Sequence, residues 1–156
     1  MKYSIQFSDA IHIMLYIEIY QNTDYLSSTK IADSVQTNPV NVRKIMAQLK
    51  KSQLIQTQTG KANPKLTRPI SQITLLDVYQ SIEGNTNLIQ VDPKTNMKCV
   101  VGANIQSVLE KQYDKLQETV ESEMAKVTLD TLVKDLVIAE KQQRLDNDDI
   151  IQRYEI

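Results

Sequence analysis

Residues 26–55 constrain the fold most, because they hold two short helical patterns separated by only a few residues. The first pattern starts at Ser27 or Ser28, whose side chains suit the position before a helix, and runs to about Val35. Its apolar residues share one side, where the small Ala32 lets a second helix approach closely. The two residues that follow make a tight turn.

The second pattern begins at Asn38 and Pro39, a strong helix-start signal. The Asn side chain accepts a hydrogen bond from an otherwise unpaired amide, and Pro in the first turn lacks only a donor that the helix does not need. The helix then runs to about Lys51, with an inward stripe of Val42, Ile45, Met46 and Leu49. Two short helices joined in this way predict a helix-turn-helix.

A hairpin is predicted directly after these helices. Residues 55–59 alternate in polarity, residues 60–64 (GKANP) hold turn-forming Gly and Pro, and residues 65–67 resume the alternation. A two-stranded hairpin in this place is a wing, here with a basic tip. The fold class expected is therefore mainly α: a winged helix-turn-helix with a two-stranded wing.

The rest of the chain divides around this unit. Residues 4–20 predict a first helix, and residues 74–84 predict another, with Thr74 and Asp77 as a capping box and Gly84 as its stop. The expected parts are a winged helix-turn-helix domain at 1–84, an ordered loop with Cys99 at 85–103, helices at 104–140 and a charged, frayed tail at 141–156.

The helix expected from residue 104 to about 127 is longer than a small winged-helix head can cover. Its apolar stripe therefore needs a partner, and the same helix of a second subunit is the simplest one. We predict a homodimer whose interface is formed by Ile105, Val108, Leu109, Gln112, Leu116, Val120 and Met124.

Charge separates the two halves of the chain, although the net charge is only −1. No acidic residue lies between Asp33 and Asp77, and this interval holds seven cations: Arg43, Lys44, Lys50, Lys51, Lys61, Lys65 and Arg68. A basic segment of this kind suits a polyanion such as DNA, or else forms an ordinary solvated surface.

The position of these charges in a helix-turn-helix favours DNA, because the start of the second helix enters the major groove. Arg or Lys can read guanine, Asn can read adenine, and Val can touch a thymine methyl. The contacts expected are Ser28, Thr29, Lys30, Asn38, Pro39, Val40, Asn41, Arg43, Lys44, Lys61 and Lys65. The alternative is a winged-helix module that binds only proteins.

Several other classes of function lack the residues they need. The chain has one cysteine and one histidine, His12, so neither a metal site nor a catalytic set emerges, and an enzyme is not expected. The apolar N-terminus lacks the basic region and cleavage site of a signal peptide, and no stretch is long enough to span a membrane. A cytoplasmic location is the default expectation.

Cys99 supports two readings. A lone cysteine commonly serves as a small hydrophobe. Lys98 beside it can favour the thiolate, in which case the thiol of each subunit could pair across the dimer or accept a small thiol as a redox switch.

The chain resembles the Rrf2 family of bacterial winged-helix regulators over roughly residues 3–135. The resemblance is carried by FSDAIHIMLYI, by SSTKIADSVQTNPVNVRKIMAQLKKSQLI, by VGANIQSVLEKQYDKLQ and most specifically by ITLLDVYQSIEG. It implies a homodimer that binds partly palindromic operators, often as a repressor, with the long helix as dimer interface. It places the DNA contacts around residues 38–44 and on the wing.

The sequence departs from that family in two places. Members that bind an iron–sulfur cluster carry three cysteines before the long helix, whereas VDPKTNMKC here holds only Cys99, so no cluster is expected. Many members have a glycine-rich wing followed by Tyr, whereas this wing reads TGKANPKLTRP.

Overall fold

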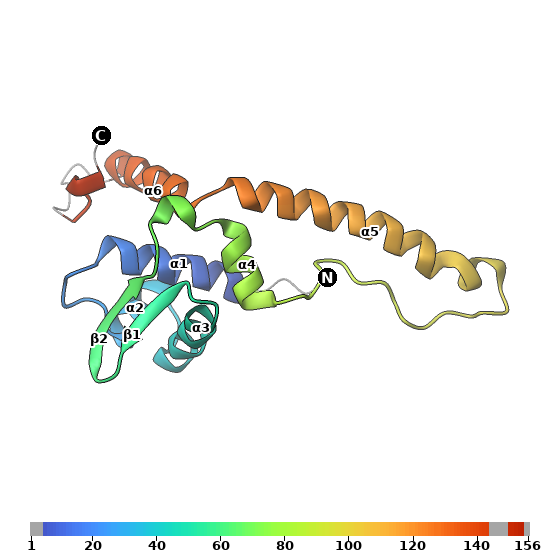
Figure 1. Ribbon diagram of the computed structural model, residues 1–156, viewed down its shortest axis with the longest axis horizontal. Coiled ribbons are helices and arrows are strands. Elements are labelled where there is room, and N and C mark those ends of the chain that lie inside the picture. The colour runs from blue at the N-terminus through green and yellow to red at the C-terminus, as the bar shows by residue number, and fades with distance from the viewer. Residues whose placement is uncertain (1–4, 144–149, 155–156) are drawn as a thin grey trace.

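The computed structural model describes residues 5–143 and 150–154. A compact head carries one long helical arm (Figure 1). The elements run α1 (Ile5–Ile19), α2 (Ser28–Val35), α3 (Pro39–Lys51), β1 (Ile55–Gln58), β2 (Lys61–Leu66), η1 (Ile70–Gln72), α4 (Leu75–Glu83), α5 (Val100–Lys126), α6 (Leu129–Gln143) and η2 (Gln152–Tyr154).

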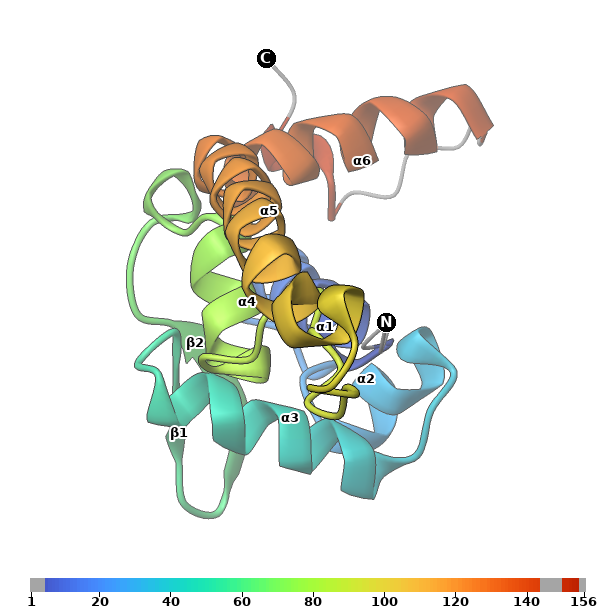
Figure 2. The same ribbon diagram turned by 90° about the vertical axis from the view of Figure 1, so that its right-hand side faces the viewer.

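The helix-turn-helix is confirmed, and its caps explain its short turn. Ser27 caps α2 by accepting a hydrogen bond from the Lys30 amide, and Asn38 caps α3 through the Asn41 amide. Gln36 takes a left-handed conformation (φ 60°) that ends α2 and lets the chain reverse. The two helices lie at the base of the head, on the side away from α6 (Figures 1 and 2).

The wing is also confirmed, with a shorter turn than predicted. The strands are antiparallel, with Gln56 opposite Lys65 and Gln58 opposite Lys61, so only Thr59 and Gly60 connect them. Gly60 adopts φ 76°, which lets the chain turn in so few residues. Pro64 is accommodated inside β2 because the ladder is irregular at this point.

One hydrophobic core holds the head together, and its members come from every helix of the head and from α6. Ala32 is almost fully buried, as close packing of α2 on α3 requires. The largest fully buried side chains are Ile13, Met14, Ile17, Leu26, Ile31, Val42, Ile45, Leu49, Ile55, Ile73, Val78 and Leu129.

The arm is joined to the head by a short antiparallel contact rather than by a loop. The Leu75 amide donates to Val127 O and the Leu129 amide donates to Ile73 O, both at 2.9 Å, around a bridge between Thr74 and Thr128. Leu129 is fully buried in the head core. The C-terminal end of α5 is thus fixed to the start of α4.

The expected start of the long helix at residue 104 is four residues late, because α5 begins at Val100 with Cys99 as its cap residue. The preceding loop crosses the first turn of α5 so closely that a Cβ on Gly102 would lie 2.2 Å from Asn96 O. Gly102, which the sequence places in a loop, is thus a residue of the first turn of α5. The loop then lies along α5, held by bonds from the Leu88 amide to Gln117 and from Gln106 to Asp92 O (Figure 1).

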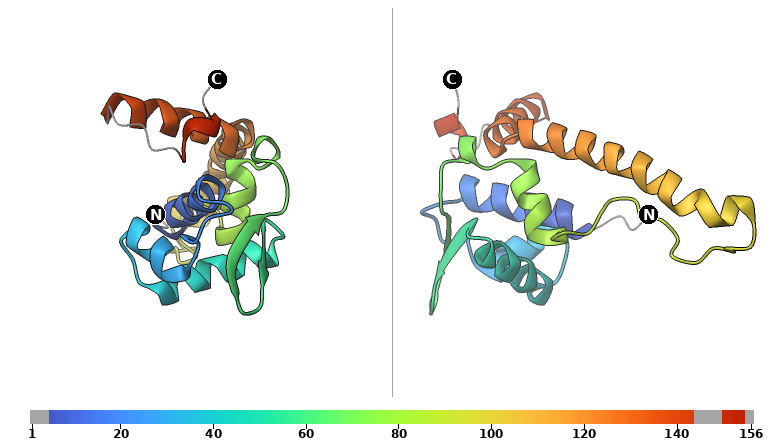
Figure 3. Two further views of the ribbon diagram at one scale, coloured as in Figure 1. Left: turned by 90° about the vertical axis from the view of Figure 1, so that its left-hand side faces the viewer. Right: turned by 45° about the vertical axis from the view of Figure 1, so that its right-hand side comes forward.

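The predicted tail from residue 141 also differs from the structure. Helix α6 continues to Gln143, and residues 150–154 pack on the head (Figure 3). Ile151 is buried with Ile19, Val133 and Val137, because it covers apolar surface that α1 and α6 leave between them. Residues 144–149 and 155–156, also part of the predicted tail, lie outside the described residues.

Candidate nucleic-acid interface

The outward face of α3 matches the helical periodicity of the sequence. Val42, Ile45 and Leu49 are buried, while the opposite side of the helix is exposed. Val40 in the first turn is 66% exposed, although it is a large apolar residue. Exposed Lys44 and Lys51 lie on the same side, together with the small Ala47. This side of α3 can accept a negatively charged and partly apolar surface.

Asn41 is less available than its neighbours. Its side chain is half-buried, and its amide nitrogen donates to Thr37 Oγ1 at 3.1 Å. Two-point reading of adenine needs both ends of the amide. In this conformation Asn41 stabilises the turn between α2 and α3, together with the Asn38 cap. Pro39 is half-buried beside it in the first turn.

Arg43 reaches from α3 to the start of α2. Its Nη1 donates to Ser28 Oγ at 3.0 Å. Thr29 and Lys30 follow on the same turn of α2 and are exposed, with the Lys30 ammonium 6.0 Å from the centre of the Tyr25 ring. The predicted contacts from the two helices therefore lie side by side at the base of the head.

The wing presents two Gln–Lys pairs on its exposed face. Gln56 is opposite Lys65, Gln58 is opposite Lys61, and all four side chains are exposed. Sequence reasoning identified the lysines but missed the glutamines. The alternation of β1, with Ile55 buried and Gln56 exposed, was the signal that could have found them.

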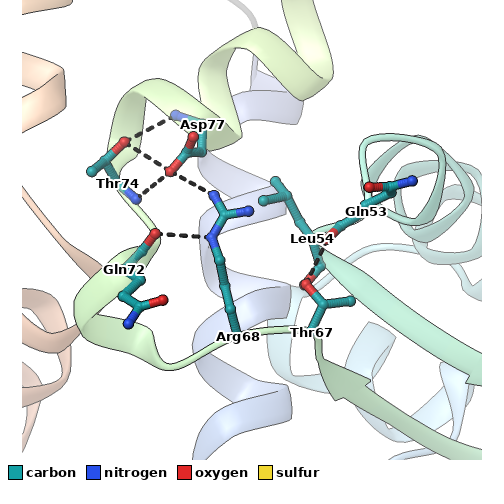
Figure 4. A network of polar contacts seen from close by, with 7 residues as sticks. All are labelled: Gln53, Leu54, Thr67, Arg68, Gln72, Thr74 and Asp77. Atoms are coloured by element: carbon teal, nitrogen blue, oxygen red, sulfur yellow. Dashed lines mark hydrogen bonds and ion pairs between the residues drawn. The ribbon is translucent and has the colours of Figure 1, made fainter.

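Six of the seven cations of the acid-free segment are exposed and form no ion pair within the described part of the chain. Arg68 is the exception, because its Nη2 lies 3.0 Å from Asp77 Oδ2 (Figure 4). Arg68 also donates to Gln72 O, so this cation ties the end of the wing to α4. The base of the head keeps its positive charge without it.

Asp77 forms the predicted capping box with Thr74. Burial alone would raise its pKa, but hydrogen bonds from the Thr74 amide and hydroxyl, with the charge of Arg68, outweigh it and lower the pKa. Thr67 completes the same junction by donating to Gln53 O (Figure 4).

The predicted dimer residues all lie on α5, where no side chain is fully buried. Val108 is 55% exposed and Leu116 is 51% exposed. Gln112 is exposed as well, and the half-buried members are Ile105, Leu109, Val120 and Met124. Met97, Val100 and Val101 extend the apolar surface past the predicted start of the helix.

The model of the Rrf2 family, described as an iron-dependent transcriptional regulator, matches residues 3–135. The chain belongs to the Rrf2 family. YwnA of Bacillus subtilis (strain 168), whose name assigns it to the HTH-type transcriptional regulators, is 35% identical over 127 residues, covering 81% of this chain and 93% of that relative. Membership makes the chain an Rrf2-type transcription regulator and not an enzyme.

Two solved Rrf2 structures share the fold at low sequence identity. IscR from T. potens is 19% identical, with a TM-score of 0.66 over 94% of each chain. CymR, the global cysteine regulator of B. subtilis, is 15% identical, with a TM-score of 0.62 over 85% of this chain and 95% of that one. These structures support the winged-helix fold.

The iron in the Rrf2 description does not fit the donors present in this chain. Cys99 is the single cysteine of the sequence, and the described residues contain no group of three His, Cys, Asp or Glu side chains that could hold a metal ion. His12 is engaged elsewhere, with Nε2 2.9 Å from Ser34 Oγ. Cys99 supplies one of the three thiolates that an iron–sulfur cluster of the Rrf2 type takes from each chain.

None of the helices within residues 5–143 and 150–154 is long and apolar enough to cross a membrane.

Proposed function

We propose that this Rrf2 protein is a homodimeric repressor that binds partly palindromic double-stranded DNA, with α3 in the major groove. The observation that supports this most is the cluster of exposed cations on α3 and the wing, on one side of the head, which form no ion pair with any described residue. Arg43 and Lys44 lie near the start of α3, where winged-helix proteins contact base edges. Thr29, Lys30, Lys61 and Lys65 flank them as phosphate contacts.

Gel-shift titrations with duplexes from the upstream region of the gene test this proposal. We expect binding that weakens steeply as salt rises, because each neutralised phosphate releases counterions. Replacing Arg43 and Lys44 together by Ala should abolish operator binding. Replacing Lys94 and Lys98, two exposed cations of the loop along α5, removes the same charge and should leave binding nearly unchanged.

The competing function is a winged-helix module that contacts only proteins. Failure of the wild-type protein to shift any upstream fragment at low salt would favour it. Reduced transcription from a bound promoter in a purified system would support repression, whereas increased transcription would assign activation instead.

The dimer is supported by the length and surface of α5. The helix has 27 residues, which corresponds to roughly 40 Å. A single protomer buries none of its side chains fully, although apolar residues recur along its whole length. A second copy of the same helix can cover this stripe, and the resulting two-fold axis gives a two-fold operator.

We further propose that Cys99 makes the regulator responsive to thiol oxidation. The thiol is exposed at the start of α5, and the amides of Gly102 and Val101 lower its pKa by hydrogen bonding to the sulfur. A lower pKa increases the thiolate fraction, which is the reactive form. With a peroxide as oxidant, two Cys99 thiols lose two electrons and two protons to form an intersubunit disulfide, and the peroxide becomes water.

Titrating operator binding against peroxide in wild type and Cys99→Ser separates this proposal from an inert thiol. A loss of binding in wild type that the variant does not show would support sensing. An equal loss of operator binding in both proteins would contradict the proposal that Cys99 senses oxidation.

We also propose that the protein binds no iron–sulfur cluster. Protein purified without oxygen should contain no stoichiometric iron and no visible absorption band. A bound cluster would overturn this proposal, and it would mean that ligands other than Cys99 hold the iron.

A further inference from the structure

The hydrogen bond between Ser28 and Arg43 joins the two helices of the helix-turn-helix at the candidate DNA surface. Arg43 is the fifth residue of α3, and Ser28 is the first residue of α2. The 3.0 Å contact runs from a guanidinium Nη1 to a hydroxyl oxygen. A long, exposed side chain is thereby held at its far end by a different helix.

Ser28 is free to do this because it is not needed as a cap. Ser27 caps α2 through the Lys30 amide, so the Ser28 hydroxyl serves no bond of its own helix. The guanidinium also keeps most of its capacity, since Arg has five N–H donors and this contact uses one. No carboxylate within the described residues pairs with Arg43, so its charge stays available.

We propose that Ser28 is a positioning residue that fixes the Arg43 guanidinium for two-point reading of guanine, rather than a phosphate anchor. This inference rests on the proposed DNA-binding function. Arg reads guanine through two parallel hydrogen bonds to O6 and N7, which require a defined orientation of the planar fork. An unrestrained arginine would lose rotamer entropy on binding, and a pre-oriented one loses less.

The two possible roles of Ser28 predict different losses of DNA affinity when its hydroxyl is removed. A phosphate contact adds affinity for every duplex alike, because the backbone carries no sequence information. A positioning contact adds affinity only where the guanine is present. The ratio of specific to non-specific affinity therefore separates them.

The experiment uses the full-length protein with a duplex selected by it from a random pool, and with a scrambled duplex of the same length and composition. Ser28→Ala should reduce the specific-to-scrambled affinity ratio roughly three- to tenfold, and should leave both scrambled binding and its salt dependence unchanged. Ser28→Thr keeps the hydroxyl and should restore the ratio. Thr29→Ala, on the same turn, should weaken both duplexes together.

Arg43→Lys supplies the coupling measurement. Lysine keeps the charge but loses the fork, so Ser28→Ala should have little further effect on the ratio in that background. Equal losses on both duplexes in Ser28→Ala, or additive effects in the double variant, would overturn the positioning role. A wild-type protein that selects no sequence from the pool would instead overturn the proposed function itself, and the inference with it.

Discussion

Arg68 Nη2 lies 3.0 Å from Asp77 Oδ2 and joins the end of the wing to the first turn of α4. The same carboxylate accepts the Thr74 amide and hydroxyl, so a single side chain closes a helix cap and anchors the hairpin. A cation from the acid-free segment is thus used to build the head, and the remaining six are left at its surface.

Asp77→Ala should destabilise the head by about 1–2 kcal/mol at neutral pH, because it removes the capping box and a partly exposed ion pair. The pKa of Asp77 is lowered in the folded state. Its contribution is therefore complete above the unfolded pKa, near 3.9, and is lost as pH falls through the lower folded value. Urea unfolding of wild type and variant at pH 7 and at progressively acidic pH should show the difference shrinking. A constant difference would contradict the assignment.

Leu116→Glu on the exposed stripe of α5 should convert the dimer to monomers, because it places a charge in the proposed apolar interface. Operator affinity should fall with it, since both half-sites need a linked head. Sedimentation of the variant measures the change, with Ser107→Glu, at an exposed position on the opposite side of the same helix, as control. A wild-type protein that sediments as a monomer would contradict the proposed dimer.

Gly102→Ala should detach the loop from the start of α5. The new Cβ would lie 2.2 Å from Asn96 O, a backbone atom that can give way only if the loop moves. Overpacking of this kind destabilises by about 1–3 kcal/mol. Here the effect should be confined to the loop and the first turn of α5. Limited proteolysis between residues 85 and 99 should accelerate, while Ala103→Ser, at an exposed neighbouring position, should leave the pattern unchanged.

Ile151→Ala should weaken the packing of the C-terminal segment on the head by about 2 kcal/mol, because this buried side chain fills the gap between α1 and α6. Ile138 on α6 is 55% exposed, so Ile138→Ala is a matched control with little expected effect. Thermal unfolding compares the two. Equal shifts would show that residues 150–154 add no stability.

Tyr154 should make the stability of the protein depend on pH in the alkaline range, as Asp77 does in the acidic range. Burial first, then the hydrogen bond and charge of Glu18, raise the pKa of Tyr154 to about 12. A raised pKa of a phenol adds stability that is complete below the unfolded value, near 10, and is lost as pH rises towards 12. The stability difference between wild type and Tyr154→Phe should therefore be larger at pH 9 than at pH 11.

The head was predictable from local signals. The Asn38–Pro39 start, the Thr74–Asp77 cap and the inward stripe of α3 each depend on residues a few positions apart, and all appear as expected. The prediction was less accurate for the wing, where Gly60 and Pro64 are both turn-forming residues. Thr59 and Gly60 make the wing turn without Pro64, so Lys61 lies in β2 and not in the loop.

Contacts between distant segments account for what sequence reasoning missed. Gly102 looked like a loop residue because nothing local indicates that Asn96 passes over it. Ile151 looked like part of a polar tail because its partners, Ile19 and Val137, come from two other helices. The bond from Arg43 to Ser28 likewise joins residues of two helices, and a basic side chain by itself does not reveal whether a neighbour orients it.

The bridge between Thr74 and Thr128 has a mechanical consequence. Because two backbone hydrogen bonds flank this bridge and Leu129 is buried in the head core, we expect that, in a dimer paired through α5, a tilt of one arm against the other would move its recognition helix with it. Half-site separation, about 34–36 Å in two-fold operators of this type, would then be set by how the two arms cross, far along the chain from the residues that read the bases.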